Sequence, residues 1–74
     1  METTPSYDLT ADREELLAAL RTLAQGRDWI PTDELSRRLI WSAIRVHVVL
    51  HSLQGDGLAE VTFDGVRAGA RPLG

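Results

Sequence analysis

Leucines recur at helical spacing near the start of the chain. Apolar residues three and four positions apart lie on one face of a helix, and this spacing joins Leu16, Leu17, Leu20, Leu23 and Ala24. Thr10 is a suitable N-cap, and Gly26 can take the left-handed conformation that ends helices. The pattern predicts a helix over about 11–25, preceded by a flexible polar arm at 1–8.

Two shorter helices are predicted next. Ile30 precedes Pro31, which favours an extended backbone, and Thr32 is the expected N-cap of a second helix that ends near Ile40. Ser42 is the expected cap of a third helix over about 42–54, before a glycine-rich turn. The buried stripe of this third helix is predicted to be Val46, Val49, Leu50 and Leu53.

The hydrophobic period changes after the third helix. β-forming residues surround Asp64-Gly65, a strong two-residue hairpin signal, so strands are expected near 58–63 and 66–71. Trp29, Trp41 and Phe63 are the large aromatic side chains expected to complete the core. The predicted fold class is α+β and mainly α, with three helices and a C-terminal β-hairpin in one domain over 9–74.

Charge is distributed unevenly along the 74 residues. The formal net charge is −3, but residues 1–34 hold eight acidic residues against three arginines, whereas residues 35–74 hold three against five. Overall acidity argues against strong non-specific binding to polyanions, although the C-terminal half alone does not. We expect a cytoplasmic protein without membrane contact, because the sequence has no cysteine, no long apolar run and no basic N-terminus.

The order of helix, extended segment, two close helices and hairpin resembles a winged helix-turn-helix. The resemblance is carried by Asp33-Glu34-Leu35-Ser36-Arg37-Arg38-Leu39, the short turn to Ser42, and Leu50-His51-Ser52-Leu53-Gln54-Gly55-Asp56-Gly57-Leu58, and it covers about residues 9–67. It implies a small bacterial or phage regulator of transcription or recombination. Such a domain binds double-stranded DNA with the third helix in the major groove and a wing, here about 58–71, on flanking DNA.

Transferred residue by residue, the resemblance gives three groups of candidate DNA-binding residues. The groove-facing positions would be Ser42, Ala43, Ile44, Arg45, His47 and Val48; the backbone-facing ones Thr32, Arg37 and Arg38; and the wing ones Arg67 and Arg71. Arg45 is the long donor on this face and suits guanine O6 and N7. Ile44 and Val48, four residues apart and exposed, depart from the usual polar pattern and suit either thymine methyls or another protein.

The alternative hypothesis is a protein-interaction module that uses the apolar exposed face of the third helix or the acidic first helix. We expect a homodimer or a partner protein in either case, because a monomer with few arginines neutralises few phosphates. The chain could also be one domain of a longer protein. No catalytic constellation is present, and His47 and His51 lack a third ligand, so we expect neither an enzyme nor a metal or other cofactor.

Overall fold

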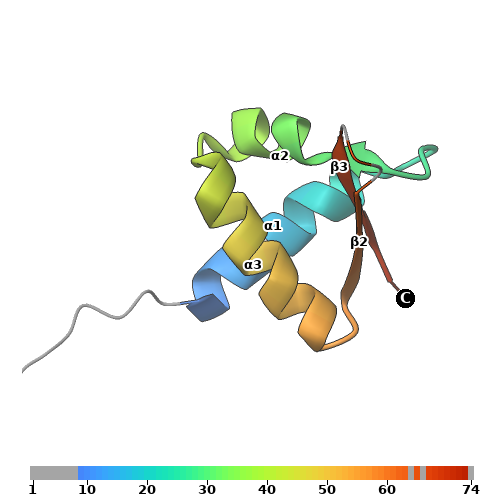
Figure 1. The fold of residues 1–74 in the computed structure, drawn as a ribbon. Coiled ribbons are helices and arrows are strands. Elements are labelled where there is room, and N and C mark those ends of the chain that lie inside the picture. Colours follow the sequence, from blue (N-terminus) through green and yellow to red (C-terminus); the bar gives the residue numbers. More distant parts are fainter. Residues whose placement is uncertain (1–8, 64, 66, 74) are drawn as a thin grey trace, which may run out of the picture.

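The computed structural model describes residues 9–63, 65 and 67–73; the predicted arm at 1–8 lies outside this range. The described chain is a small, mainly helical α+β domain (Figure 1). Its elements in chain order are α1 (Leu9–Leu23), β1 (Ile30–Pro31), α2 (Thr32–Leu39), α3 (Ala43–Gly55), β2 (Ala59–Phe63) and β3 (Ala68–Pro72). The three predicted helices and the hairpin are therefore confirmed, with α1 two residues earlier than expected.

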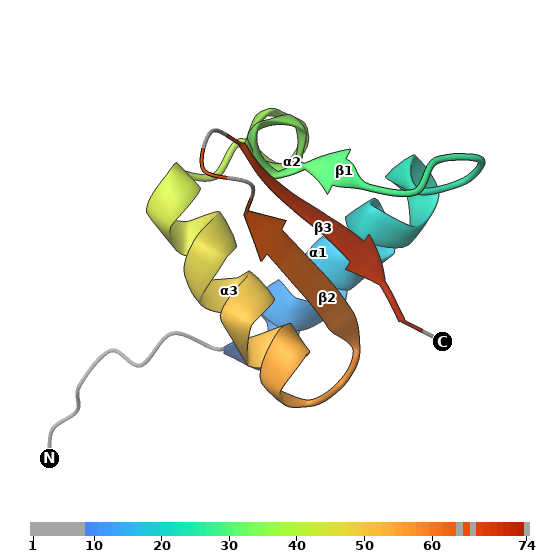
Figure 2. The same ribbon diagram turned by 45° about the vertical axis from the view of Figure 1, so that its right-hand side comes forward.

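The strands form an antiparallel sheet in the order β1-β3-β2. Figure 2 shows β3 between the other two strands, with Ala70 paired to Ile30 on one side and to Val61 on the other. The segment around Ile30, predicted only to be extended, is thus a short edge strand. Gly65 has φ +94° in the connection between β2 and β3, whereas Asp64 of the predicted turn lies outside the described residues.

Side chains from all three helices and the sheet form one core. The predicted stripe of α3 is fully buried, and it packs with α1, α2 and the inner face of the sheet through Leu16, Leu20, Ile30, Leu35, Ala59 and Ala70. Trp41 is buried as predicted. The interior therefore follows the helical spacing that the sequence contains.

Two aromatic residues expected in the core lie outside it. Phe63 is 68% exposed, because it is the last residue of β2 and extends past the point where the helices cover the sheet. Trp29 is exposed as well, and its ring lies under the guanidinium of Arg71 at 4.6 Å. The alternation of residues along a strand predicts that Phe63 belongs to the inner face of the sheet. It does not predict how far along that face the core extends.

The helix ends differ from the expectations at two threonines. Thr32 does not cap α2: Pro31 occupies the N-cap position, no side chain supplies a capping hydrogen bond, and Thr32 is buried as the first helical residue. Because Pro31 is held in the sheet by its pairing with Gly69, the helix begins directly after it, at Thr32, one residue earlier than a Thr32 cap would require. Thr10 lies inside α1 rather than before it. Ser42 does cap α3, and its hydroxyl accepts a hydrogen bond from the Arg45 backbone N–H at 3.2 Å.

Ile40 ends α2 in a left-handed conformation. Its φ is +57° and its side chain is 89% exposed, while the backbone N–H of Ile40 bonds to the Ser36 carbonyl. This region is disfavoured for β-branched residues. Because the chain turns sharply at Ile40, α3 begins only three residues later, at Ala43.

Candidate nucleic-acid interface

A concavity lies where the start of α2, the side of α3 and the end of the β2–β3 hairpin meet. Its volume is about 470 Å³, and it is lined by Pro31, Thr32, Asp33, Arg37, His47, Phe63, Arg67 and Ala68. Four predicted DNA-binding residues, one or more from each of the three elements, are therefore brought together: Thr32, Arg37, His47 and Arg67.

The short strand β1 explains why these elements converge. Pro31 pairs with Gly69, next to the first residue of β3, and α2 begins at the following residue. The start of α2 is consequently placed beside the end of the hairpin that carries Arg67. One turn along α2, Arg37 follows Asp33 by four residues on the same helix face. His47 completes the concavity from α3.

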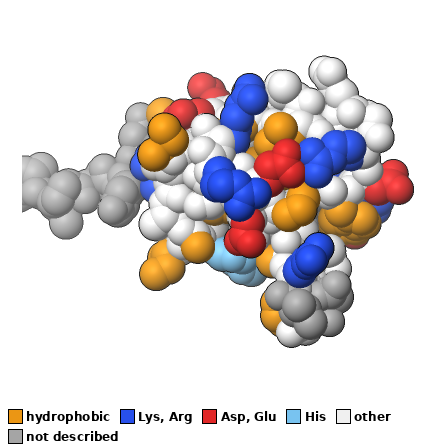
Figure 3. All heavy atoms as spheres, turned by 90° about the horizontal axis from the view of Figure 1, so that it is seen from above, with side chains coloured by type: hydrophobic (Ala, Val, Ile, Leu, Met, Phe, Trp, Pro, Cys, Tyr) orange, Lys and Arg blue, Asp and Glu red, His pale blue; other side chains and the backbone are white. Residues whose placement is uncertain are grey.

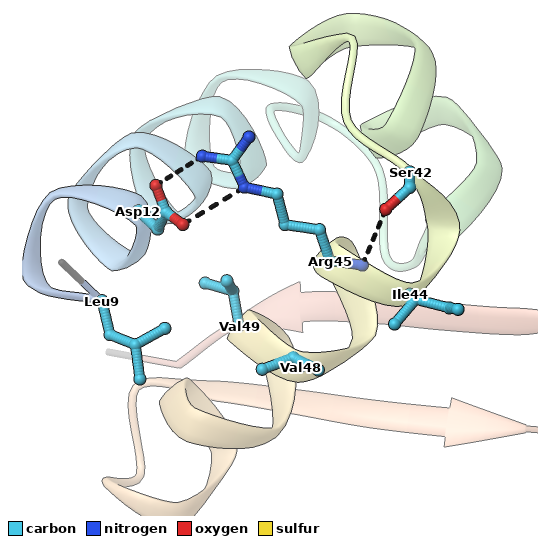
Figure 4. Close-up of a pocket in the computed structure, with 7 residues that line it drawn as sticks. All are labelled: Leu9, Asp12, Ser42, Ile44, Arg45, Val48 and Val49. Carbon is cyan, nitrogen blue, oxygen red and sulfur yellow. Dashed lines mark hydrogen bonds and ion pairs between the residues drawn. The ribbon is translucent and has the colours of Figure 1, made fainter. Parts of the chain in front are cut away.

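Arg45 lies on the side of α3 that faces α1. Its Nε and one terminal nitrogen donate to the two carboxylate oxygens of Asp12, at 3.2 and 2.7 Å (Figure 4). The guanidinium also lies 4.1 Å from the centre of the Trp41 ring. The Asp12 side chain is 12% exposed and that of Arg45 is 40% exposed. This geometry joins α1 to α3, a role that the sequence-based interpretation did not foresee.

Arg71 belongs to the body of the sheet rather than to the tip of the hairpin. It pairs across strands with Glu60, and its Nε donates to a Glu60 carboxylate oxygen at 2.7 Å. Its guanidinium also covers the Trp29 ring. Four positions of extended chain, about 13 Å, separate Arg67 from Arg71, so the two predicted wing residues lie at different places on the hairpin, and Arg67 lines the concavity whereas Arg71 does not.

Several arginines pair with carboxylates within the part of the chain that the structure describes. Besides the two pairs above, Arg13 pairs with Asp56 and Arg27 pairs with Glu34. Figure 3 accordingly shows basic and acidic side chains interspersed over the face seen from above, without one continuous basic surface. The positive charge predicted for the C-terminal half is therefore partly neutralised within the fold.

The Arg27–Glu34 pair connects the segment after α1 to the first turn of α2. Two terminal nitrogens of Arg27 donate to the two carboxylate oxygens of Glu34, at 2.8 and 2.9 Å. These hydrogen bonds hold the pKa of Glu34 below its ordinary value and raise the pKa of Arg27. This pair fixes the approach of the chain to β1 and hence to α2.

The remaining predicted positions are exposed on α2 and α3. Ile44 is 77% exposed and Val48 is 52% exposed, as predicted, and Ser42, Ala43 and Arg38 are also exposed. The hydroxyl of Ser42 is already used as the cap of α3. Arg38, although next to Arg37, does not line the concavity.

Ile44 and Val48 are four residues apart in α3 and are both exposed; we name this pair the aliphatic stripe. Ile40 is exposed too, but it lies in the left-handed turn before α3, where helical spacing does not apply. Beside the aliphatic stripe, Leu9, Val49 and the Asp12–Arg45 pair help to line a shallow, mainly apolar pocket of about 210 Å³ (Figure 4). The stripe and the concavity occupy different sides of α3.

Comparisons with protein-family models, with curated proteins and with solved structures find no match to this chain. Within residues 9–63, 65 and 67–73, no helix is long and apolar enough to cross a membrane. The same residues contain no group of three or more histidine, aspartate or glutamate side chains arranged to hold a metal ion.

Proposed function

We propose that this chain is a winged helix-turn-helix domain that binds double-stranded DNA, as a small bacterial or phage regulator of transcription or recombination. The observation that carries the proposal is the concavity between α2, α3 and the hairpin, where residues from three separate elements offer donors on one side of the molecule. The element order and the sheet order β1-β3-β2 also support it.

In the proposed complex, the exposed side of α3 enters the major groove, and Arg37 and Arg67, which line the same concavity beside α3, hold phosphates of the adjoining backbone. Among the described residues that line the concavity, two arginines stand against Asp33, and His47 and Thr32 add hydrogen-bonding groups. Two phosphate contacts give only modest affinity. A homodimer that joins two half-sites would raise the affinity while each domain binds its half-site in the same way.

Arg45 has a different role in this proposal from the guanine reader that its position in the sequence suggested. Because its guanidinium already satisfies Asp12 and stacks on Trp41, reading a base would require the loss of both interactions. We assign Arg45 to holding α3 in place against α1. Base contacts then rest on His47 and on apolar contacts of Ile44 and Val48 with thymine methyls.

Fluorescence anisotropy with a labelled random-sequence duplex at low and moderate salt tests the proposal. The wild-type protein should bind at low salt, and Arg37→Ala with Arg67→Ala should weaken binding and reduce the salt slope by about 0.9 for each phosphate that is no longer neutralised. Arg21→Ala is the matched control, because it removes an exposed arginine from the last turn of α1, outside the concavity. No binding of the wild type at low salt would refute the proposal.

The aliphatic stripe favours a second candidate function, a protein-interaction module. Ile44 and Val48, two exposed aliphatic residues one turn apart in α3, form a surface that another protein or a second copy could cover. Sedimentation analysis of Ile44→Asp tests this, with Ala18→Asp, on the exposed side of α1, as the control. A fall in mass only with Ile44→Asp supports self-association through the stripe; unchanged mass in both excludes self-association through the stripe.

A further inference from the structure

Phe63 is an exposed aromatic ring inside the candidate interface. It lines the same concavity as Arg37, His47 and Arg67, and 68% of its surface is open to solvent. Its position at the end of β2 places it on the helix-facing side of the sheet, after Ala59 and Val61, but beyond the core. Leaving so large an apolar ring in water has no evident benefit for the fold.

The chemistry of the ring limits what it can do in this place. A phenyl group has no hydrogen-bonding atoms, so it cannot read the polar edges of bases; it can stack on a base or open the step between two stacked bases. The side chains around it fit a polyanion better than an apolar protein surface, because Arg37 and Arg67 outnumber Asp33 in the concavity. A DNA strand supplies both partners, phosphates for the arginines and sugar and base surfaces for the ring.

We propose that Phe63 is an apolar wedge that enters the minor groove of duplex DNA beside the phosphates held by Arg37 and Arg67. This inference rests on the proposed DNA-binding function and adds to it a residue for which no sequence signal was recognised. Partial insertion of apolar side chains at base steps kinks the duplex by about 20–90°. The domain should therefore bend the DNA that it binds, and Phe63 should be required for the bend.

The test combines affinity with DNA shape. A duplex labelled with a donor and an acceptor at its ends reports the bend through energy transfer, and anisotropy reports the affinity. Phe63→Ser should weaken binding by roughly tenfold and abolish the increase in energy transfer. Phe63→Trp should retain affinity within about twofold, and its indole fluorescence should be quenched on binding beyond any change of Trp29 and Trp41 in the wild type.

Controls separate this inference from the function on which it rests. Ala18→Ser changes an exposed apolar side chain of α1, outside both the concavity and the pocket beside the aliphatic stripe, and should change neither affinity nor bend. Thermal melting should confirm that Phe63→Ser folds, as expected for an exposed residue. If the wild type binds DNA and Phe63→Ser binds with the same affinity and the same bend, the wedge proposal is refuted but the DNA-binding proposal is not. Absence of wild-type binding overturns both proposals, and a change in sedimentation mass with Phe63→Ser would then assign the ring to a protein interface.

Discussion

Removal of the Asp12–Arg45 pair tests how the orientation of α3 is fixed. The perturbation is a double-mutant cycle of Asp12→Asn, Arg45→Met and the double variant. Asparagine keeps the shape of the carboxylate, and methionine keeps an unbranched apolar stem near Trp41. Since Asp12 also lies in the first turn of α1, where a negative charge is favoured by the helix dipole, the cycle is needed to isolate the pair from that contribution.

The magnitude follows from burial and geometry. Hydrogen bonds to charged groups contribute about 1.5–3 kcal/mol each when well formed, and the pair has two of them at 3.2 and 2.7 Å. The Arg45 side chain is 40% exposed, so solvent screening reduces the effect. We expect a coupling free energy of about 1–2 kcal/mol, and about 2 kcal/mol of destabilisation for Asp12→Asn alone.

Urea and thermal unfolding followed by circular dichroism measure these free energies. A domain of this size loses about 4–8 °C of melting temperature for each kcal/mol, so Asp12→Asn should melt roughly 10 °C lower. A coupling free energy below about 0.3 kcal/mol, the usual error of additivity, would show that the pair does not fix the orientation of α3. DNA affinity of the folded variants adds a second readout: loss with Arg45→Met but not with Asp12→Asn would return Arg45 to the role of a base-reading residue.

Three further changes have expected outcomes. Ile40→Gly should raise the free energy of unfolding by up to about 1 kcal/mol in urea titrations, because relief of the left-handed conformation, about 1–2 kcal/mol, exceeds the entropic cost of glycine in the unfolded chain, about 0.4–1 kcal/mol, and the exposed side chain loses no packing; a destabilised variant would contradict this. The pKa of Glu34, measured by NMR, should lie below its ordinary value and return to it in Arg27→Gln. Since the pKa of Glu34 is lower in the folded state, the pair's stabilisation should be present above the unfolded-state pKa and disappear as pH falls through the folded-state pKa. Glu34→Gln should therefore reduce the loss of stability on acidification. An unchanged dependence of stability on pH in the acidic range would show that the pair does not contribute. Leu50→Ala should cost about 2–5 kcal/mol through its cavity, a large part of the total for a domain of this length, and a near-native melting temperature would argue against the core described above.

Local spacing predicted the parts of the fold that depend on neighbours in sequence. The stripe of α3 and its Ser42 cap follow from residues within one or two helical turns, and both are present. Gly26 has φ +76°, as its place after α1 indicated. Thr32 shows the limit of this reasoning, because the start of α2 is decided by the pairing of Pro31 with Gly69, 38 positions away in the chain.

The candidate site depended on long-range contacts that spacing does not reveal. Helical spacing predicts Arg45 on the exposed face of α3, whereas in the structure it faces α1. Its partner Asp12 is 33 residues away in the chain and is one of eleven acidic residues, so spacing alone does not identify it. Similarly, Phe63 follows the alternation of an inner-face residue, but only the arrangement of the helices determines where the core ends.

The pairing of arginines within the fold changes what DNA binding by this domain would look like. If Arg37 and Arg67 each hold one phosphate, the logarithm of affinity should fall with the logarithm of salt concentration at a slope of about −1.8 for one domain, and twice that for a dimer. Such a shallow slope means that ionic contacts alone cannot account for useful affinity, so apolar contacts from Phe63, Ile44 and Val48 would have to supply much of it. A slope near zero would instead favour the protein-interaction alternative, and a slope steeper than about −4 would require further arginines, such as the exposed Arg38, to contact phosphate.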